Sequence, residues 1–405
     1  MPFEIPESWC WCKLSDVCNF ESGYAFSSDD YKDKGTPLVR ISNIQDGLVS
    51  LDNCVYIEGD IDKRFIINNG DLLIAMSGAT TGKMGVYQYD CPALLNQRVG
   101  NIKVNTSLLL QKYRDYFMQS QGDLILKLSY GGAQPNVSAK IISDLFIPIP
   151  SLNEQEKIVA EIEKWFGFID EIENGKIELE SHIKKTKSKI LDLAISGKLV
   201  PQDPNDEPAI ELLKRINPDF EPCDNSHYEN LPENWCLAKV KDVFVINPRN
   251  KAEDNTIAGF IPMTLIDDGY SNTFSYEKRK WGAIKTGFTH FADGDVAVAK
   301  ISPCLENRKS IVLRDLPNGI GAGTTELHVF RSSVVSPEYA LYFFKSEYFI
   351  SRCVGTFNGV VGQQRVGKNI IEEIQIPIPP INEQTKIVST IEKIFTQLNT
   401  ITAEL

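Results

Sequence analysis

The most constraining feature of this sequence is a long internal repeat. Residues 147–159 read IPIPSLNEQEKIV and residues 376–388 read IPIPPINEQTKIV. Upstream, PESWC at 6–10 recurs as PENWC at 232–236. Solenoid repeats are about 20–50 residues long, so a match over this much greater separation indicates a duplicated domain. The sequence therefore predicts two similar units, each of roughly 150 residues, placed one after the other.

The two copies share further landmarks inside each unit. A Gly-Asp step precedes an apolar run at 70–71 and again at 294–295, and Gln-x-x-Val precedes IPIP at 134–137 and 363–366. Short apolar runs bounded by Gly, Asp or Asn predict strands, and large apolar residues at helical spacing predict helices. The expected strands are 37–44, 71–76, 295–301 and 311–313, and the expected helices are 107–118 and 337–350. Each unit is therefore predicted to be a compact α+β domain.

A different pattern follows each IPIP segment. Proline cannot continue a strand ladder, so a helix is expected to begin just beyond it, with Ser151, Asn153 or Asn382 as the N-cap. Apolar residues then recur at alternating steps of four and three, which is typical of a coiled-coil seam. The seam positions, with two polar interruptions at Lys176 and Thr186, are Ile158, Ile162, Trp165, Ile169, Ile172, Lys176, Leu179, Ile183, Thr186, Ile190 and Leu193, and then Ile387, Ile391, Ile394, Leu398, Ile401 and Leu405. The two helices are expected to pair with each other.

The predicted fold class is therefore α+β, with two pseudo-symmetric domains joined by long antiparallel coiled-coil helices. The predicted boundaries are 1–150 for the first domain, 151–198 for a central spacer helix, 199–230 for a linker, 231–379 for the second domain and 380–405 for a distal spacer helix. Because an α-helix rises about 1.5 Å per residue, such a pair of helices is suited to hold two domains a fixed distance apart.

Composition limits the class of protein. With 405 residues, 42% hydrophobic and 24% charged, the chain is typical of a globular protein with two or three domains. Its nine cysteines include no C-x-x-C pair, so neither a disulfide framework nor a metal site is expected. No signal pattern or apolar run of about 20 residues occurs, so we expect a cytoplasmic protein without a membrane partner. A net charge of −12 confines any polyanion binding to local basic patches.

Residues 76–85, MSGATTGKMG, resemble a phosphate-binding loop but do not match one. A Walker A loop needs two glycines five positions apart, followed by Lys-Ser/Thr. Here Gly78 and Gly82 are one residue too close, and Met84 stands where the hydroxyl ligand of Mg²⁺ should be. The corresponding stretch of the second copy, SPCLENRKS at 302–310, contains no glycine. A glycine-rich turn that meets a DNA backbone phosphate is the better interpretation.

Taken together, the motifs resemble one family over nearly the whole chain. The IPIP-x-x-NEQ-x-KIV helix starts, the linker SGKLVPQDPNDEPAIELL, the step GDLLIAMSGATTGKMG and the stretch GTTELHVFR at 323–331 are similar to those of DNA specificity (S) subunits of type I restriction-modification systems. The resemblance implies two target recognition domains that each read one half of a bipartite site in double-stranded DNA. It also implies that the two helices separate these domains and dock two methyltransferase subunits.

The same resemblance implies a non-catalytic chain that binds no cofactor of its own. In such a complex the methyltransferase subunits methylate adenine at N6 with S-adenosylmethionine. Added restriction subunits, which use ATP and Mg²⁺ and translocate DNA, cleave unmodified DNA. One difference from the pattern is that the first helical segment continues for about 45 residues and the second for about 25 before Leu405.

The candidate DNA contacts are polar residues in loops at corresponding places of the two copies. Arg pairs bidentately with guanine, Asn or Gln with adenine, and Lys or a backbone N–H with phosphate. The candidates in the first copy are Arg40, Ser42, Gly78, Lys83, Gln97, Arg98, Gln134 and Asn136. Those in the second are Lys300, Arg308, Lys309, Thr324, Gln363, Gln364, Arg365 and Lys368. Because the loops recur while the sequence between them diverges, the two copies are expected to read different half-sites.

A second candidate surface is formed by aromatic residues of the two helices. Trp165, Phe166, Phe168 and Phe395 are more than a pair of helices can bury, and exposed aromatic residues are typical of protein interfaces. They are predicted to bind the partner subunits.

Three other functions fit the sequence less well. An adenine methyltransferase needs an Asn/Asp-Pro-Pro-aromatic tetrapeptide, and the nearest matches, Asn217-Pro218-Asp219 and Asn247-Pro248-Arg249, lack the second proline and the aromatic residue. A coiled-coil scaffold without a DNA role explains the duplication but not the recurring polar loops. The sequence distinguishes only weakly between a type I specificity subunit and a specificity subunit of another restriction-modification type.

Overall fold

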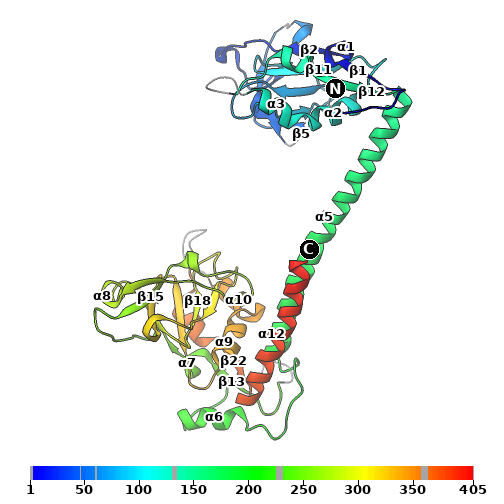
Figure 1. Ribbon diagram of the computed structural model, residues 1–405. Coiled ribbons are helices and arrows are strands. Elements are labelled where there is room, and N and C mark those ends of the chain that lie inside the picture. Colours follow the sequence, from blue (N-terminus) through cyan, green and yellow to red (C-terminus); the bar gives the residue numbers. More distant parts are fainter. Residues whose placement is uncertain are drawn as a thin grey trace. The chain divides into compact units, whose positions relative to one another are not determined.

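A computed structural model of the chain describes residues 3–45, 47–59, 62–129, 135–224, 231–356 and 364–404. The chain divides into two compact units, Met1–Ile172 and Glu173–Leu405, hereafter the N-terminal and C-terminal units. The boundary lies inside one continuous helix, α5 (Leu152–Ile195), so each unit includes a part of it (Figure 1). Among the described helices, none has the length and apolar character that a membrane span requires.

Two sheets form the core of the N-terminal unit. The larger sheet has the order β2 (Cys18–Ser22), β11 (Val99–Val104), β8 (Leu72–Ala75), β9 (Met84–Val86), β5 (Gly47–Val49) and β4 (Ile44–Gln45). The smaller has the order β6 (Val55–Ile57), β3 (Thr36–Val39), β10 (Ala93–Leu95) and β7 (Ile66–Ile67). All four residues of β8 are buried, as expected of an apolar run that packs on both faces.

The C-terminal unit repeats most of this arrangement, with four strands in place of the six of the larger sheet. One sheet has the order β14 (Val245–Ile246), β21 (Leu327–Arg331), β18 (Val296–Ala299) and β19 (Ser310–Val312). The other has the order β16 (Glu277–Lys280), β15 (Ile257–Ile261), β20 (Ile320–Gly323) and β17 (Thr289–Ala292). The parallel pair β3–β10 recurs as the parallel pair β15–β20. The predicted α+β class and the duplication are confirmed.

The two repeated motifs at the edges of each unit pair with each other. β1 (Cys10–Lys13) is antiparallel to β12 (Phe146–Ile149), with Cys10 opposite Ile149. In the C-terminal unit, β13 (Cys236–Lys239) is antiparallel to β22 (Gln375–Ile378), with Cys236 opposite Ile378. The sequence similarity of the PESWC and IPIP segments therefore reflects one two-stranded ladder that occurs twice.

Short helices complete both units. They are α1 (Leu14–Val17), α2 (Gln111–Ser120), α3 (Gly122–Ser129) and α4 (Ala139–Ser143), then α6 (Ala209–Ile216), α7 (Val240–Val243), α8 (Trp281–Ile284), α9 (Pro337–Phe344), α10 (Glu347–Val354) and α11 (Lys368–Glu373). The single helix predicted over 337–350 is in fact two. The hydroxyl of Ser346 accepts a 3.3 Å hydrogen bond from the Phe349 amide and so begins α10 as its N-cap.

The repeated glutamine of the NEQ motif explains why this motif occurs at both helix starts. The Gln155 amide group donates to the Leu108 and Pro150 carbonyls and accepts from the Leu110 amide. In α12 (Ile381–Ala403), Gln384 makes the same three bonds, to Val334, Pro379 and Ser336. Both glutamines are fully buried, so their hydrogen bonds hold the start of each helix against the segments that precede it in the chain.

The N-cap prediction is confirmed for only one of the three candidates. The Ser151 hydroxyl accepts from the Glu154 amide at 3.4 Å, at the start of α5. Asn153 and Asn382 instead lie within the helices, and the Asn382 side chain donates to Asp206 at 3.0 Å.

Within the C-terminal unit, α12 runs antiparallel beside the last part of α5 (Figure 1). Ile183 is buried, Ile190 shares a core with Ile387 and Ile391, and Lys187 Nζ donates to Asn399. The earlier seam positions of α5 differ from the prediction. Trp165, Ile169, Ile172 and Leu179 have 59%, 47%, 71% and 37% of their surface exposed. The heptad pattern predicted apolar positions correctly, but among the described residues α12 covers only the C-terminal end of that seam.

Candidate nucleic-acid interface

The predicted DNA contacts of the N-terminal unit meet at one end of its larger sheet. The Met76 amide, just after β8, donates to the Arg98 carbonyl at 2.9 Å, and the Val137 amide donates to the Met76 carbonyl at 2.9 Å. The Asn96 amide donates to the Val39 carbonyl at 3.1 Å, which brings the residues after β3 to the same place. Four segments of the chain thus converge. They carry Arg40 and Ser42, Gly78 to Lys83, Gln97 and Arg98, and Asn136.

Most side chains of this cluster face solvent. Ser42, Lys83, Gln97, Arg98 and Asn136 are exposed, and Arg40 is half-buried. The Arg40 guanidinium lies 5.8 Å from the ring centroid of Tyr31.

The cluster also holds buried polar atoms without a protein partner. Arg40 Nε, Ser77 Oγ and Thr80 Oγ1 are buried and make no hydrogen bond within the described part of the chain. Buried polar atoms are usually paired, so three of them in one group of loops favour a site that a polar ligand completes.

The glycine-rich turn uses several of its amides, including that of Gly78, for hydrogen bonds within the protein. Gly78 and Gly82 have φ of +86° and +84°, which glycine adopts without strain. The Gly78 amide donates to the Pro135 carbonyl at 3.2 Å, and the Thr81 hydroxyl donates to both of the carbonyls of Gly78 and Pro135. The amides of Thr81, Gly82 and Lys83 also donate inside the turn or to β8. The Gly78 N–H is therefore already used within the protein, whereas the exposed Lys83 side chain can still reach a phosphate.

The same pattern of backbone hydrogen bonds between these loops, hereafter the loop frame, occurs in the C-terminal unit with different side chains. The Lys300 amide donates to the Glu326 carbonyl and the Val366 amide to the Lys300 carbonyl, both at 2.9 Å. Ile301 pairs with Arg365 in an isolated antiparallel bridge, as Ser77 pairs with Asn136. By these bonds Glu326 stands at the position of Arg98, and Arg365 at the position of Asn136. Gln364 joins the frame, since its carbonyl accepts from the Ser302 amide at 2.8 Å.

Arg365 forms an ion pair with Glu326, a residue that sequence reasoning missed. Its Nε and Nη2 atoms lie 2.7 Å and 2.9 Å from the two carboxylate oxygens. The Arg365 side chain is 44% exposed and that of Glu326 is 24% exposed. The hydrogen bonds from Arg365 lower the pKa of Glu326, which keeps it ionised. An acidic residue is not an obvious DNA contact, so only the structure reveals this pair.

Two other predicted residues of this unit remain at its surface or close to it. Lys368 is exposed and forms an ion pair with Glu372 at 3.1 Å, one turn further along α11. The Thr324 hydroxyl accepts from the Glu326 amide at 3.2 Å and so supports the turn before β21.

Two predicted contacts of the C-terminal unit turn into the protein instead. Arg308 has a side chain only 10% exposed, and its guanidinium donates to the Lys345 carbonyl and to Glu347. Lys309 Nζ donates to the Ile266 carbonyl at 2.6 Å. The loop that holds them replaces the glycine turn of the N-terminal unit, and it directs both cations toward buried carbonyl oxygens. The prediction that these two residues contact DNA is therefore corrected.

A cleft of about 350 Å³ opens beside Lys300. Its lining residues are Asn247, Pro248, Arg249, Gly287, Phe288, Thr289, His290, Lys300, Thr325 and Leu327. Arg249 is exposed and lies 3.4 Å from His290 Nε2, and burial lowers the pKa of His290, so Arg249 faces a neutral ring. In the sequence, Arg249 stands out only as part of the candidate methyltransferase tetrapeptide Asn247-Pro248-Arg249. Its partner in that motif, Asn247, holds β21 through a 3.0 Å bond from the Val329 amide.

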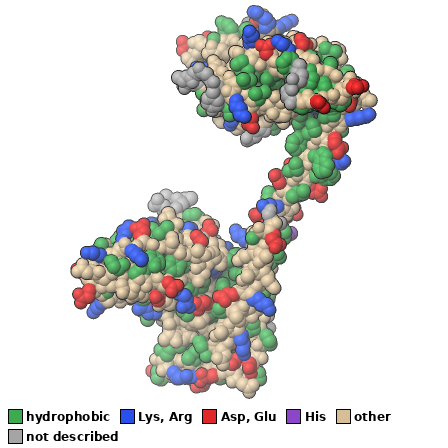
Figure 2. All heavy atoms as spheres, in the orientation of Figure 1, with side chains coloured by type: hydrophobic (Ala, Val, Ile, Leu, Met, Phe, Trp, Pro, Cys, Tyr) green, Lys and Arg blue, Asp and Glu red, His purple; other side chains and the backbone are tan. Residues whose placement is uncertain are grey.

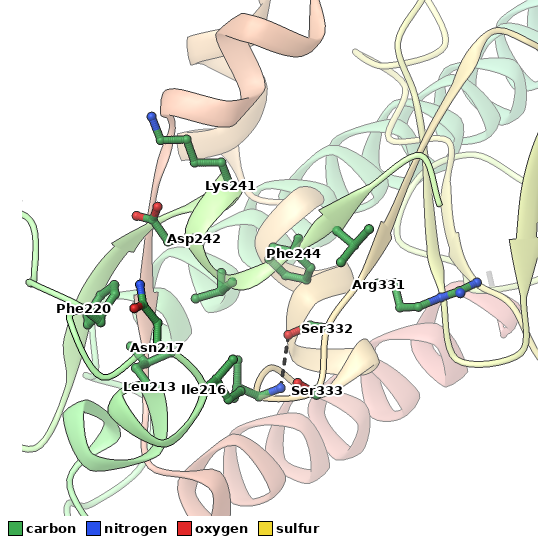
Figure 3. Close-up of a pocket in the computed structure, with 13 residues that line it drawn as sticks. Leu213, Ile216, Asn217, Phe220, Lys241, Asp242, Phe244, Arg331, Ser332 and Ser333 are labelled. Atoms are coloured by element: carbon green, nitrogen blue, oxygen red, sulfur yellow. Dashed lines mark hydrogen bonds between the residues drawn. The ribbon is translucent and has the colours of Figure 1, made fainter. Parts of the chain in front are cut away.

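A second cavity, of about 430 Å³, lies where the linker packs on the C-terminal unit (Figure 3). Leu213, Ile216 and Phe220 form its apolar side, and Lys241, Asp242 and Arg331 contribute charge. Asn217, the first residue of the other tetrapeptide candidate, accepts a 3.2 Å hydrogen bond from the Asp219 amide and so shapes the turn after α6. The structure therefore gives this asparagine a local role in the linker.

The predicted partner surface is exposed on α5 but not on α12. Trp165, Phe166 and Phe168 have 59%, 49% and 45% of their surface exposed, and Ile169, Ile172 and Ile177 extend the apolar face. Figure 2 shows hydrophobic side chains on this part of α5. The prediction for Phe395 is corrected, because this residue is only 6% exposed and packs against Tyr270 and Tyr342 at centroid distances of 5.5 Å and 5.9 Å.

Two of the predicted DNA contacts, Gln134 and Gln363, lie outside the described residues.

Comparison with known sequences identifies relatives of both units. The family described as Type I restriction modification DNA specificity domain matches residues 6–181 and again residues 232–405. The chain is 42% identical over 241 residues to the Type I restriction enzyme EcoEI specificity subunit of Escherichia coli, a match that covers 55% of this chain and 40% of that protein. It is 41% identical over 251 residues to the EcoAI specificity subunit of the same species, covering 57% of this chain and 42% of that protein. The chain thus matches about two fifths of the length of these two relatives.

Solved structures share the fold. The crystal structure of the HsdS subunit from Thermoanaerobacter tengcongensis matches with a TM-score of 0.58 and 16% identity, covering 100% of this chain and 93% of that chain. A structure concerned with complex assembly and conformational transition of the type I R-M system matches with a TM-score of 0.62 and 16% identity, covering 100% and 94%. Because the family match occupies most of the sequence and occurs once in each unit, this chain belongs to the type I restriction-modification DNA specificity family.

Proposed function

We propose that this chain is the sequence-specific DNA-recognition subunit of a type I restriction-modification complex, and that each unit reads one half of a bipartite site. One observation carries the proposal. The two units hold the same loop frame, bonded through equivalent amides at Met76 and Lys300, yet present different polar side chains on it. A common frame with different reading groups suits two half-sites of different sequence.

The net charge of −12 shapes how this chain would bind DNA. Long-range attraction to phosphate is weak for an acidic chain, so the cations of the two loop clusters act locally. Tight binding therefore requires further protein surface around the DNA. In this proposal two methyltransferase subunits supply that surface, and the apolar face of α5 around Trp165 and Phe168 receives them, since aromatic residues dominate protein interfaces.

The chemistry of the complex belongs to the partners in this proposal. The chain itself binds no cofactor and catalyses no step. The methyltransferase subunits bind S-adenosylmethionine and methylate adenine at N6, and restriction subunits bind ATP and Mg²⁺ and cleave unmodified DNA in the cytoplasm. Helices α5 and α12 set the spacing between the two half-sites.

The proposal is tested by producing the full chain together with the methyltransferase subunits of the same system in a host that lacks other adenine methylation. We expect N6-methyladenine at one bipartite sequence throughout the host genome, and none when this chain is omitted. Methylation at the same sequence without this chain, or methylation without any sequence preference, contradicts the proposal. In a second arm, the purified chain incubated alone with labelled S-adenosylmethionine and DNA should transfer no methyl group.

A further inference from the structure

One position of the loop frame carries a neutral amide side chain in the N-terminal unit and a cationic side chain in the C-terminal unit. In the N-terminal unit, Asn136 forms an isolated bridge with Ser77, shortly after β8. In the C-terminal unit, Arg365 forms the equivalent bridge with Ile301, shortly after β18. In both units the following valine, Val137 or Val366, is buried and donates its amide to the frame. The backbone on which Asn136 and Arg365 stand is thus fixed in the same way, so a difference in what they bind must come from the side chains.

The neighbouring position changes charge as well. Arg98 in the N-terminal unit and Glu326 in the C-terminal unit occupy equivalent places, since their carbonyls accept from Met76 and Lys300. Asn136 therefore has a cation at the adjacent frame position, whereas Arg365 has a carboxylate there and is held by it through two hydrogen bonds. A carboxylate that engages Nε and one terminal nitrogen restricts the rotamers of the guanidinium. The 44% exposure of the Arg365 side chain leaves a substantial part of it facing outward.

We propose that this frame position selects one base in each half-site, with Arg365 reading guanine, Asn136 reading adenine, and Glu326 acting as the positioning residue for Arg365. The proposal rests on the proposed function. Arg matches the O6 and N7 acceptors of guanine, and Asn matches the N7 acceptor and the N6 amino group of adenine, both in the major groove. Fixing a side chain before binding strengthens selection, because less conformational freedom is lost on binding.

The competing role for Glu326 is to neutralise Arg365 and keep it away from DNA. The two roles predict opposite results for the loss of the carboxylate. If Glu326 positions Arg365, its removal lowers selection of guanine. If Glu326 masks Arg365, its removal raises affinity and adds a base preference.

The test uses the full chain assembled with its methyltransferase subunits and a DNA library randomised over both half-sites, with bound sequences counted before and after selection. Replacing Arg365→Asn should change the preferred base pair at one position of one half-site from G·C to A·T, by about 10- to 100-fold. Replacing Asn136→Arg together with Arg98→Glu transfers the acidic pair to the N-terminal unit and should make the reverse change in the other half-site.

Glu326 is tested by two substitutions. Glu326→Ala should lower the preference for guanine at the position that Arg365→Asn alters, about tenfold or more, and leave all other positions unchanged. Glu326→Asp keeps the carboxylate and should restore part of the preference. A role in the fold alone would lower the melting temperature and leave the base preference intact, which overturns the positioning role.

The matched control is a second Arg–Glu pair of the C-terminal unit. Arg314 pairs with Glu338, and their side chains are 54% and 25% exposed, close to the values for Arg365 and Glu326. Arg314 follows β19 and lies near the Gly-Asp end of β18, opposite to the Lys300 end. Arg314→Asn should leave every base preference unchanged.

The unaltered half-site reports folding within each variant, since it must still be selected. A variant that selects both half-sites exactly as the wild type does overturns the assignment of its residue. If the swap variants fail to assemble, Arg365→Lys, which keeps the charge but loses the planar fork, must still lower the guanine preference, or the assignment fails. A wild-type complex that enriches no sequence overturns the proposed function itself, an outcome distinct from all of these.

Discussion

Arg308 and Lys345 each donate a hydrogen bond to the backbone of the other. Arg308 Nε lies 3.0 Å from the Lys345 carbonyl oxygen, and Lys345 Nζ lies 2.8 Å from the Arg308 carbonyl oxygen. Lys345 is fully buried, and its ammonium also donates to the Gly269 carbonyl. Two cations thus stabilise each other's loops although their charges repel, because carbonyl oxygens and Glu347 surround them.

Replacing Arg308→Met should lower the free energy of unfolding without changing the DNA sequence that is selected. The variant loses the bond to the Lys345 carbonyl and the pair with Glu347, a cost of about 1–3 kcal/mol. Urea unfolding and selection from a randomised DNA library measure the two quantities. A changed base preference at unchanged stability would restore Arg308 as a DNA contact.

The lowered pKa of Lys345 should make the stability of the fold depend on pH. Burial, with repulsion from Arg308 as a smaller cause, lowers the pKa of Lys345 to about 7, whereas the pKa of a lysine in the unfolded chain is about 10.4. Above that value neither state is protonated. As the pH falls toward about 7 the unfolded chain takes up its proton first, so the folded state loses stability, and below about 7 the loss is complete.

The stability of the wild type relative to Lys345→Met should therefore increase between pH 7 and pH 10, by up to a few kcal/mol at about 1.4 kcal/mol per pKa unit. Urea unfolding at several pH values in this window measures the difference. Lys185→Met, which removes an exposed lysine by the same substitution, serves as the control. A flat difference for Lys345→Met would show that the buried ammonium does not titrate in this range.

Lys83 and Lys309 stand at the same place of the frame and should behave differently. Their carbonyls accept from Ala75 and Ala299, but Lys83 is exposed while Lys309 donates to Ile266. In the assembled complex, Lys83→Ala should reduce the slope of log K against log salt by about 1 and weaken all DNA sequences alike. Lys309→Ala should leave that slope unchanged and lower the melting temperature. Fluorescence anisotropy over a salt series measures the slope, and equal slopes for Lys83→Ala and wild type would exclude a phosphate contact.

Truncation of Trp165 and truncation of Phe395, both predicted partner residues, should have different effects. Trp165→Ala should weaken binding of the methyltransferase subunit about tenfold or more, since truncated aromatic residues at interfaces commonly cost at least 1.4 kcal/mol. It should leave the melting temperature close to that of the wild type, because the side chain is 59% exposed. Phe395→Ala should instead lower the unfolding free energy by about 3–5 kcal/mol. Titration calorimetry and thermal unfolding separate the two effects, and unaltered binding by Trp165→Ala would remove this face of α5 from the interface.

The sequence predicts the parts of the fold that depend on local chemistry and on repetition. The helix starts after IPIP and the apolar runs of β8 and β18 are found where they were predicted, because each is set by proline, glycine and apolar residues nearby. The pairing of the IPIP strands with the strands that follow PESWC and PENWC was not predicted and is seen only in the structure. Buried glutamines at both helix starts explain why the NEQ motif is repeated. The convergence of Lys83, Arg98 and Asn136 follows from the same duplicated frame.

The direction of individual side chains could not be predicted in the same way. Arg308, Lys309 and Phe395 turn inward because carbonyl oxygens and aromatic rings from distant segments surround them, and no local pattern records those partners. The heptads of α5 identify apolar positions but not what covers them. Glu326 was missed because its importance comes from Arg365, 39 residues further along the chain.

The ladder between β1 and β12 places Cys10 beside Ile149, so the segment between them begins and ends at one place. The ladder between β13 and β22 does the same for the segment from Cys236 to Ile378. A segment whose two ends are neighbours can be exchanged for another of similar ends without disturbing what it is attached to. Recombination between related genes at these two edges would thus exchange the whole segment, and with it the proposed reading loops, in one event. A restriction-modification system built in this way would acquire a new target sequence while its helices, and the methyltransferase subunits proposed to bind them, stay the same.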